Sequence, residues 1–190
     1  MDQAFSIWSK RMNEMTDKAL RLGAIGAVAA LLLALMNTFT EPVIAEQKAQ
    51  KLNSALTVLS GGIQPGREEM APAPGIARRW PLGAGEGWIL ELDAVGYGGP
   101  MTVVASFTSK GEVMAARLMA NSETVGFGKN AEDPTYMDIF VGSGQSVPVP
   151  VTKTALGDGA DVVAGATVTF SGISAAIAAG SKAVQEWGGQ

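Results

Sequence analysis

The pattern of hydrophobic and charged positions divides the chain into an N-terminal apolar run and a longer mixed region. Residues 22–40 are 19 consecutive uncharged residues, bounded by Arg21 and Glu41. A helix of this length rises roughly 28 Å, close to the ~30 Å hydrocarbon core of a bilayer. The run therefore predicts a transmembrane helix over 21–40, preceded by a tail over 1–20. A cleaved signal peptide is the alternative, but the segment before the run is long for one and no clear small-residue cleavage site follows.

The region after the apolar run begins with helical periodicity. Pro42 is expected to kink or restart the helix there. Apolar residues then recur at helical spacing over 43–59, which predicts an amphipathic helix within a juxtamembrane segment 41–60. Residues 63–87 are rich in proline and glycine and are expected to form a loop.

Alternating and β-branched runs predict an antiparallel sheet in the rest of the chain. A turn at 109–111 is expected to join two of its strands into a hairpin. A final helix is expected over 171–187, where apolar residues share one face. The predicted fold class is α+β: a single N-terminal transmembrane helix, then a domain over 61–190 with an antiparallel sheet and flanking helices. The expected strands are 88–93, 101–107, 112–119, 137–141 and 147–151.

Composition excludes several kinds of chemistry. The chain has no cysteine and no histidine. This excludes disulfides, iron–sulfur clusters, histidine-bound haem, most zinc sites and Ser-His-Asp triads. We expect no metal site and no catalytic residue, so any redox chemistry must use an organic cofactor. The net charge of −4 argues against a nucleic-acid partner.

Basic residues indicate the orientation of the transmembrane helix. Lysine and arginine are commonest on the cytoplasmic side of a span, counted within about 15 residues of its ends. The bias predicts a cytoplasmic N-terminus and an extracytoplasmic C-terminal domain, at the inner membrane of a bacterial cell. Four basic residues precede the run and two follow it: Lys10, Arg11, Lys18 and Arg21, then Lys48 and Lys51.

Three glycine-rich segments are candidates for chemistry: 96–100 (GYGGP), 122–128 (SETVGFG) and 161–169 (DVVAGATVT). Each also has a plain structural explanation, because glycine serves turns and Glu123 suits a solvated surface position. In the third segment, small neighbours leave the hydroxyl of Thr167 accessible, and a helix is expected to begin a few residues later. Helix N-termini stabilise anions, so these residues predict a phosphate near Thr167.

These segments resemble the FMN-binding subunits of two related ion pumps, the G subunit of the Rnf complex and the C subunit of the sodium-pumping NADH:quinone oxidoreductase. The N-terminal helix and the segment TEPVIAEQ at 40–47 extend the resemblance. It implies that a flavin transferase joins the phosphate of FMN to the Thr167 hydroxyl as a phosphoester, and that Asp161 is part of the signal this enzyme reads. The other FMN-binding residues that it implies are Gly165, Ala166, Glu123, Thr124, Gly126 and Tyr97.

Particular roles follow for some of these residues. Tyr97 is expected to stack on the flavin ring, and backbone N–H groups near Gly126 to reach its polar edge. The carboxylate of Glu123 is expected to oppose formation of an anionic reduced flavin. The chain departs from the usual family motifs at three positions, where serine, proline and leucine are replaced by Ala164, Val125 and Phe127.

The resemblance implies an electron-relay subunit of a complex that couples ferredoxin:NAD+ oxidoreduction to Na+ or H+ translocation. Its partners would be the other membrane and redox subunits. The length of 190 residues favours the G subunit over the generally longer C subunit. The alternatives are the C subunit, a membrane-anchored FMN-domain sensor or electron-input module, and a structural subunit that has lost its flavin. The intact Gly-Ala-Thr at 165–167 weighs against the last.

Overall fold

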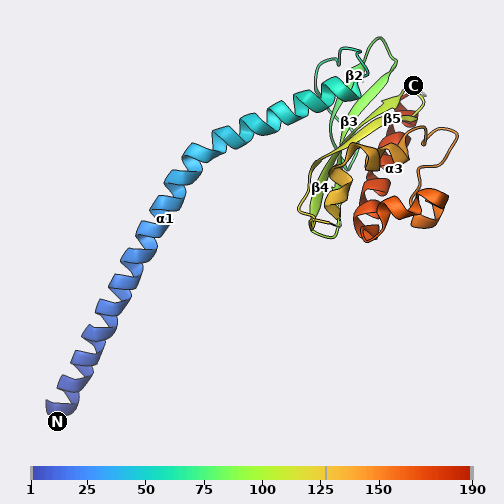
Figure 1. Cartoon of the computed structure of the whole chain (residues 1–190). Helices are drawn as coiled ribbons and strands as arrows, with labels where there is room; N and C mark the ends of the chain where they lie inside the picture. Colours follow the sequence, from blue (N-terminus) through green and yellow to red (C-terminus); the bar gives the residue numbers. More distant parts are fainter. Residues whose placement is uncertain (1, 127, 189–190) are drawn as a thin grey trace. The chain divides into compact units, whose positions relative to one another are not determined.

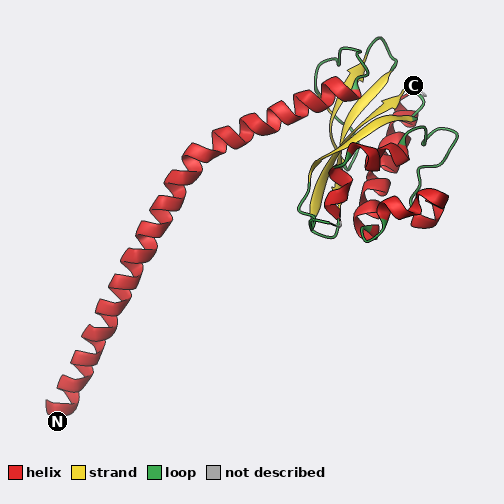
Figure 2. Ribbon diagram, viewed as in Figure 1, coloured by secondary structure: helices red, strands yellow, loops and turns green. Residues whose placement is uncertain are grey.

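The computed structural model describes residues 2–126 and 128–188. The chain divides into two units, Met1–Gln50 and Lys51–Gln190. The first is helical, and the second contains a five-stranded sheet with helices around it (Figure 1, Figure 2). This confirms the predicted α+β class.

The N-terminal helix is longer than the sequence pattern suggests. Helix α1 runs unbroken over Asp2–Leu59, with Pro42 inside it. The predicted transmembrane and amphipathic helices are therefore one element: of the two effects expected of Pro42, a kink or a restart, the restart does not occur. Pro42 lacks the N–H that would bond the carbonyl four residues earlier, and the flanking turns continue the helix on both sides.

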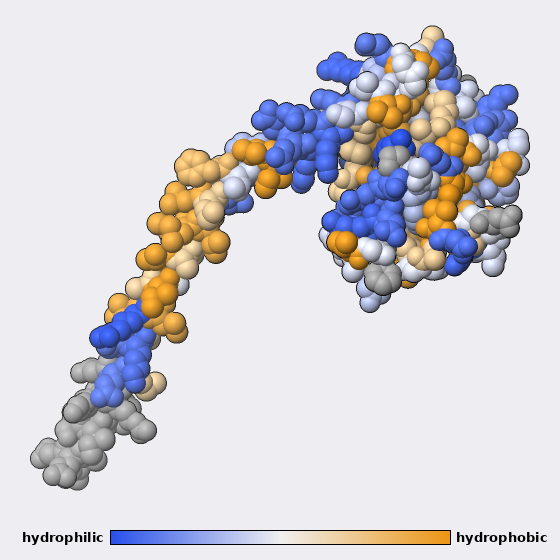
Figure 3. All heavy atoms as spheres, in the orientation of Figure 1, coloured by the Kyte–Doolittle hydropathy of each residue, from blue (hydrophilic) through white to orange (hydrophobic). Residues whose placement is uncertain are grey.

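The composition of α1 fits a single-pass membrane protein. The stretch Glu14–Leu59 is long and apolar enough to cross a bilayer. Its large apolar side chains, such as Leu31, Leu33 and Phe39, are exposed along the helix. Figure 3 shows them as a hydrophobic band with hydrophilic residues before and after it.

The sheet is an antiparallel meander in the order β1-β2-β3-β4-β5. Its longest pairing joins β3 and β4, from Gly87 opposite Thr108 to Val95 opposite Pro100. The predicted hairpin over 101–119 is confirmed as β4 and β5. The strands are β1 Glu69–Met70, β2 Ile76–Leu82, β3 Gly87–Val95, β4 Pro100–Thr108 and β5 Val113–Ala120.

The expected loop over 63–87 is wrong in part, because it contains β1 and β2. The sequence of β2 does not look like a strand of the sheet because it contains two arginines. In the fold, each of them is paired with an acidic side chain. Arg78 bonds to Glu91 on β3, and Arg79 bonds to Glu69 on β1 at 2.9 Å. Pro81 has no N–H to donate in β2, and its carbonyl accepts a bond from the Gly66 N–H at 2.7 Å.

The expected strands 137–141 and 147–151 are also wrong. The first region forms the short helix α2, Pro134–Met137, followed by the 3-10 helix η2, Asp138–Phe140. Asp133 starts α2 by accepting a bond from the Thr135 N–H at 2.9 Å. Helical spacing also brings Met137 and Phe140 into the core together. Residues 147–151 form no strand, and two prolines in five residues explain why.

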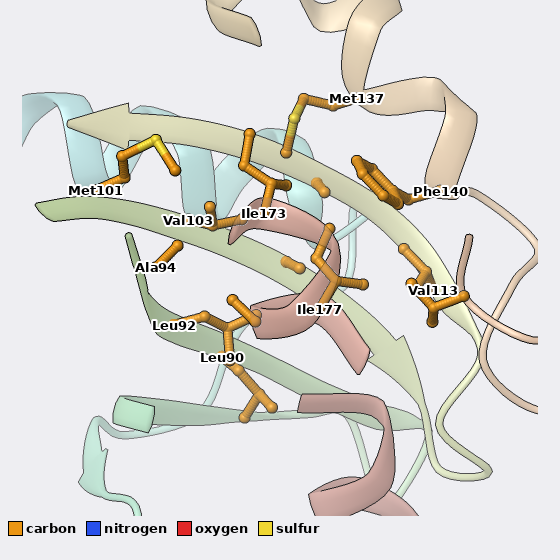
Figure 4. Packing of buried hydrophobic residues seen from close by; sticks show 14 of the residues in the cluster. Leu90, Leu92, Ala94, Met101, Val103, Val113, Met137, Phe140, Ile173 and Ile177 are labelled. Atoms are coloured by element: carbon orange, nitrogen blue, oxygen red, sulfur yellow. The ribbon is translucent and has the colours of Figure 1, made fainter. Parts of the chain in front are cut away.

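The last helix, α3, covers Thr167–Gly188 and begins four residues before the predicted start at 171. It packs on one face of the sheet through a large apolar core (Figure 4). Its approach is close, since a Cβ on Gly172 would lie 2.0 Å from the carbonyl oxygen of Val95 at the end of β3. The first turns of α3 therefore lie beside the β3–β4 connection. Residues that Figure 4 labels in this core include Leu90, Leu92, Met101, Val103, Ile173 and Ile177.

The other face of the sheet carries a smaller core. There Trp80, Leu82, Ile89 and Val104 pack with the last turns of α1. The strands are thus covered on both faces, and this explains why their central residues are fully buried.

Candidate functional site

A cavity of about 440 Å³ brings together the three glycine-rich segments of the sequence. It lies where α3 begins, beside the β3–β4 connection and the loop after β5. Its volume falls within the roughly 300–1,000 Å³ of small-molecule sites. The lining residues are Tyr97, Glu123, Thr124, Gly128, Gly165, Ala166, Thr167, Val168 and Thr169.

Glu123 connects these three segments. Only 5% of it is exposed, so the surface position considered for it is wrong. Its Oε1 accepts a bond from the Gly98 N–H at 2.9 Å, and its Oε2 accepts one from the Thr169 hydroxyl at 2.7 Å. Its own N–H donates to Oδ1 of Asn121 at 3.0 Å. One side chain therefore joins the β3–β4 connection to the first turn of α3.

The glycines around Glu123 are needed because other groups approach them closely. A Cβ on Gly96 would lie 2.1 Å from Oε1 of Glu123, and one on Gly128 would lie 2.2 Å from Oε2. A Cβ on Gly98 would lie 2.2 Å from the carbonyl oxygen of Ser122. Two of the glycine motifs thus enclose the carboxylate, which sequence spacing alone does not reveal.

The start of α3 places Thr167 at the cavity. Gly165 has φ of +77°, a left-handed conformation that glycine adopts without strain, and the chain turns there into the helix. Thr167 is exposed, and within the described chain its hydroxyl has no hydrogen-bond partner. The first intrahelical N–H bond is from Phe170 to the Ala166 carbonyl, at 2.8 Å. The N–H groups of 167–169 therefore have no helical acceptor and can bind an anion.

Thr169 has a different environment, although it is only two residues away. It is 1% exposed and its hydroxyl donates to Glu123. The segment is helical and not extended, but residues two apart in a helix also project about 200° apart around its axis. Thr169 nevertheless also lines the cavity.

Of the four remaining predicted residues, two line the cavity and two do not. Tyr97, which is 80% exposed, and Thr124 line the cavity as expected. Gly126 and Asp161 are exposed and do not line it. Asp161 lies in the 3-10 helix η3, Lys153–Val163, where its carbonyl accepts a bond from the Ala164 N–H at 3.1 Å. Phe127 lies outside the described residues.

Three residues that line the cavity were not among the predicted site residues: Gly128, Val168 and Thr169. A further residue, Tyr136, interacts electrostatically with Glu123 without lining the cavity. Tyr136 is buried, and its hydroxyl has no hydrogen-bond partner in the structure. Burial, and after it the charge of Glu123, raises the pKa of Tyr136 to about 12. No local pattern in the sequence predicts the burial of Tyr136 or its proximity to Glu123.

No group of three or more acidic, cysteine or histidine side chains placed to hold a metal ion occurs among residues 2–126 and 128–188. The cavity's polar groups are instead hydroxyls, backbone N–H groups and one buried carboxylate. These groups suit an organic ligand with a phosphate at the α3 end.

Comparison with known proteins agrees with this geometry. Residues 96–182 match the family described as FMN-binding domain, and they include every residue that lines the cavity. Residues 9–59 match the RnfG N-terminal region. The chain is 30% identical to the G subunit of the ion-translocating oxidoreductase complex of Cereibacter sphaeroides over 166 residues, 79% of this chain and 75% of the relative. It is 29% identical to the protein of that name from Pseudomonas aeruginosa, over 82% of this chain and 81% of the relative. The chain therefore belongs to the family of G subunits of the ion-translocating oxidoreductase complexes.

Proposed function

We propose that this chain is the electron-transfer subunit of a membrane-bound, Rnf-type ion-translocating oxidoreductase complex, and that it carries FMN attached through its phosphate to Thr167. The observation that carries the proposal is the cavity at the start of α3, where an unpaired threonine hydroxyl lies beside free helix N–H groups. The family match supports FMN as the cofactor.

The residues of the cavity fit a flavin mononucleotide. The first turn of α3 offers N–H groups and the positive end of its dipole to a phosphate. The exposed ring of Tyr97, in the glycine-rich segment 96–100, is available to stack on an aromatic ring. Gly128 lines the cavity beside Glu123 and adds no side chain to it.

FMN supplies the ability to take up and release electrons, which the side chains of this cysteine- and histidine-free protein do not. The chain's contribution is to hold the phosphate at Thr167 and to orient the ring. Attachment requires an activated donor, such as a flavin dinucleotide, and a flavin transferase. The O–H bond of Thr167 and the bond between the donor's phosphates break, an O–P bond forms, and the nucleoside monophosphate leaves with the proton.

Asp161 suits a role in recognition by that transferase. It is exposed, lies outside the cavity and precedes Thr167 by six residues. An enzyme that approaches the cavity from outside meets this side chain without opening the fold.

The proposed partners are the other membrane and redox subunits of the complex, which would exchange electrons with the flavin while the assembly moves Na+ or H+. The relatives are named as subunits of such a complex. We further propose a cytoplasmic N-terminus, from the excess of basic residues before the apolar run. A reporter fused after residue 190 should be active only if it is exported, and cytoplasmic activity would contradict this orientation.

The test of attachment is Thr167→Val, made together with the transferase. Valine keeps the β-branched shape and removes only the hydroxyl, so the fold should persist. The intact mass should lack the FMN increment, and the denatured band should lose its flavin fluorescence.

Thr124→Val is the matched control, because Thr124 also lines the cavity and is exposed. It should keep the full FMN increment. Thr169 is unsuitable as a simple control, since its hydroxyl is bonded to Glu123. Flavin on Thr167→Val, or its loss from Thr124→Val alone, would contradict the assignment.

A further inference from the structure

The first turn of α3 presents two threonines in opposite ways. Thr167 and Thr169 are two residues apart in a helix, so their side chains project about 200° apart around its axis. Thr167 is exposed and its hydroxyl has no hydrogen-bond partner among the described residues, whereas the Thr169 hydroxyl is buried and donates to Oε2 of Glu123 at 2.7 Å. Both line the same cavity.

The bond from Thr169 to Glu123 restrains a part of α3 that the helix itself restrains weakly. The first turn of a helix has no intrahelical acceptors for its N–H groups and is the part that frays most readily. A tether from Thr169 to a residue outside the helix therefore sets the rotation of this turn. The direction in which Thr167 projects depends on that rotation.

Glu123 is suited to act as a fixed anchor. Its other oxygen accepts the Gly98 N–H at 2.9 Å, so both carboxylate oxygens are held. Gly96 and Gly128 approach it so closely that no side chain fits at either position. None of the ion pairs found in the described part of the chain involves Glu123. Its contacts are thus hydrogen bonds to groups that must be placed correctly, not a nearby cation.

We propose that Glu123 is a positioning residue for flavin attachment: it binds the Thr169 hydroxyl and so directs the Thr167 hydroxyl into the cavity as the attachment site. This inference rests on the proposed function. It gives Glu123 a role through its hydrogen bonds, whereas the sequence suggests a role through its charge beside the ring. It also explains why one of two neighbouring threonines is modified.

The two roles are separated by comparing Glu123→Gln with Glu123→Ala. Glutamine has no charge but keeps both contacts, because its oxygen can accept from Gly98 and its amide can donate to the Thr169 oxygen. Alanine removes both contacts. The initial rate of flavin incorporation is measured on the full-length chain in detergent with the transferase and a flavin dinucleotide, by intact mass and peptide mapping.

The expected rate for Glu123→Gln is within about twofold of the unmodified sequence, and that for Glu123→Ala is lower by about tenfold or more, because small misplacements of a reacting group have large kinetic effects. Thr169→Val should lower the rate by a similar factor. The double variant Glu123→Ala/Thr169→Val should be no slower than the slower single variant, since both changes break the same link.

Ser181→Ala is the matched control for loss of stability. Its hydroxyl is buried and donates to the Gly111 carbonyl at 2.6 Å, at the far end of the same helix. This variant should lower the thermal midpoint and leave the incorporation rate unchanged. If Glu123→Ala does not fold, Glu123→Gln and Thr169→Val still test the proposal.

Three results would overturn the positioning role: equal loss of rate in Glu123→Gln and Glu123→Ala, no loss in Thr169→Val, or additive losses in the double variant. These results are distinguishable from failure of the proposed function. If the unmodified chain takes up no flavin at Thr167, the proposed function fails; if it does and the variants behave as it does, only the role of Glu123 fails.

Discussion

The two ends of α3 are held in contrasting ways. At the N-terminal end, Thr167 and Val168 are exposed at a cavity, and one hydroxyl–carboxylate bond joins Thr169 to Glu123. At the C-terminal end, the Arg79 guanidinium lies 4.6 Å from the ring of Trp88 and 4.8 Å from that of Trp187, and it also bonds to Glu69. The two tryptophans meet edge to face, with centroids 5.6 Å apart.

This difference shows how one end of a helix can stay open at a cavity. A helix that is fixed along its length and at one end needs few further contacts to place its other end. The C-terminal end supplies that fixation through cation–π and aromatic contacts, each worth about 0.5–1.5 kcal/mol. The N-terminal end is therefore free to leave hydroxyl and N–H groups without protein partners, as a ligand site requires.

The largest effect on stability is expected from a change in the middle of α3, between its two ends. Ile177 is fully buried at the centre of the face that α3 packs on the sheet. Ile177→Ala should lower the free energy of unfolding by about 3 kcal/mol, because it leaves a cavity in a well-packed core. Urea denaturation should show one cooperative transition at lower denaturant. Two separate transitions would show that the two ends of α3 unfold independently and would contradict the idea that one end fixes the other.

A smaller loss is expected when the C-terminal contacts are removed. Arg79→Gln keeps much of the side chain but removes the charge that both tryptophan rings and Glu69 contact. It should lower the free energy of unfolding by about 1–2 kcal/mol while the extent of flavin attachment at completion stays the same. Thermal unfolding with intact mass measures both.

Arg67→Gln is the matched control for this change, since Arg67 is exposed and makes no ion pair or ring contact in the described structure. Its effect should lie within about 0.5 kcal/mol. An equal loss of stability in the two variants would show that net charge, and not the Trp–Arg–Trp contact, is responsible.

The smallest effect, and one of opposite sign, is expected near the N-terminal end. Tyr136→Phe removes a buried hydroxyl that has no partner, so stability at pH 7 should rise by about 1 kcal/mol. The pKa of Tyr136 is raised to about 12 in the fold, against about 10 in an unfolded chain. Because the pKa of Tyr136 is higher in the folded chain than in the unfolded chain, the protonated phenol favours the folded state relative to the ionised one. This pH-dependent part of the stability is fully present below about pH 10 and is lost as the pH rises through about 12.

The variant should therefore lose less stability than the unmodified sequence between about pH 10 and 12, as measured by urea denaturation at each pH. Ser174→Ala is the control, because it also removes a buried hydroxyl without a partner but does not titrate in this range. An identical pH profile for Tyr136→Phe and the unmodified sequence would show that the phenol is solvated in the folded state.

The fold is predictable where local pattern and tertiary environment agree. The pattern of apolar residues alone predicts a membrane-spanning helix at the 19-residue apolar run and the hairpin of β4 and β5. It misses strand β2, because the arginines of this strand pair with acidic and aromatic side chains on other elements. It predicts a strand over 137–141 in place of the short helices α2 and η2, because a short, mostly apolar segment does not distinguish a strand from a helix.

The sequence by itself determined the membrane-spanning length of α1 and the absence of cysteine and histidine chemistry, and it is the source of the proposal that Thr167 is the attachment residue. These properties depend on residue identity and on neighbours within a few positions. Only the tertiary structure decided that Glu123 would bind Gly98, 25 residues away, and Thr169, 46 residues away. Contacts between residues so far apart in the sequence form when the sheet and α3 pack, and local periodicity does not predict them. The physical reason is that a buried carboxylate must find donors wherever the fold brings them, and here the donors belong to two of the three segments that form the cavity.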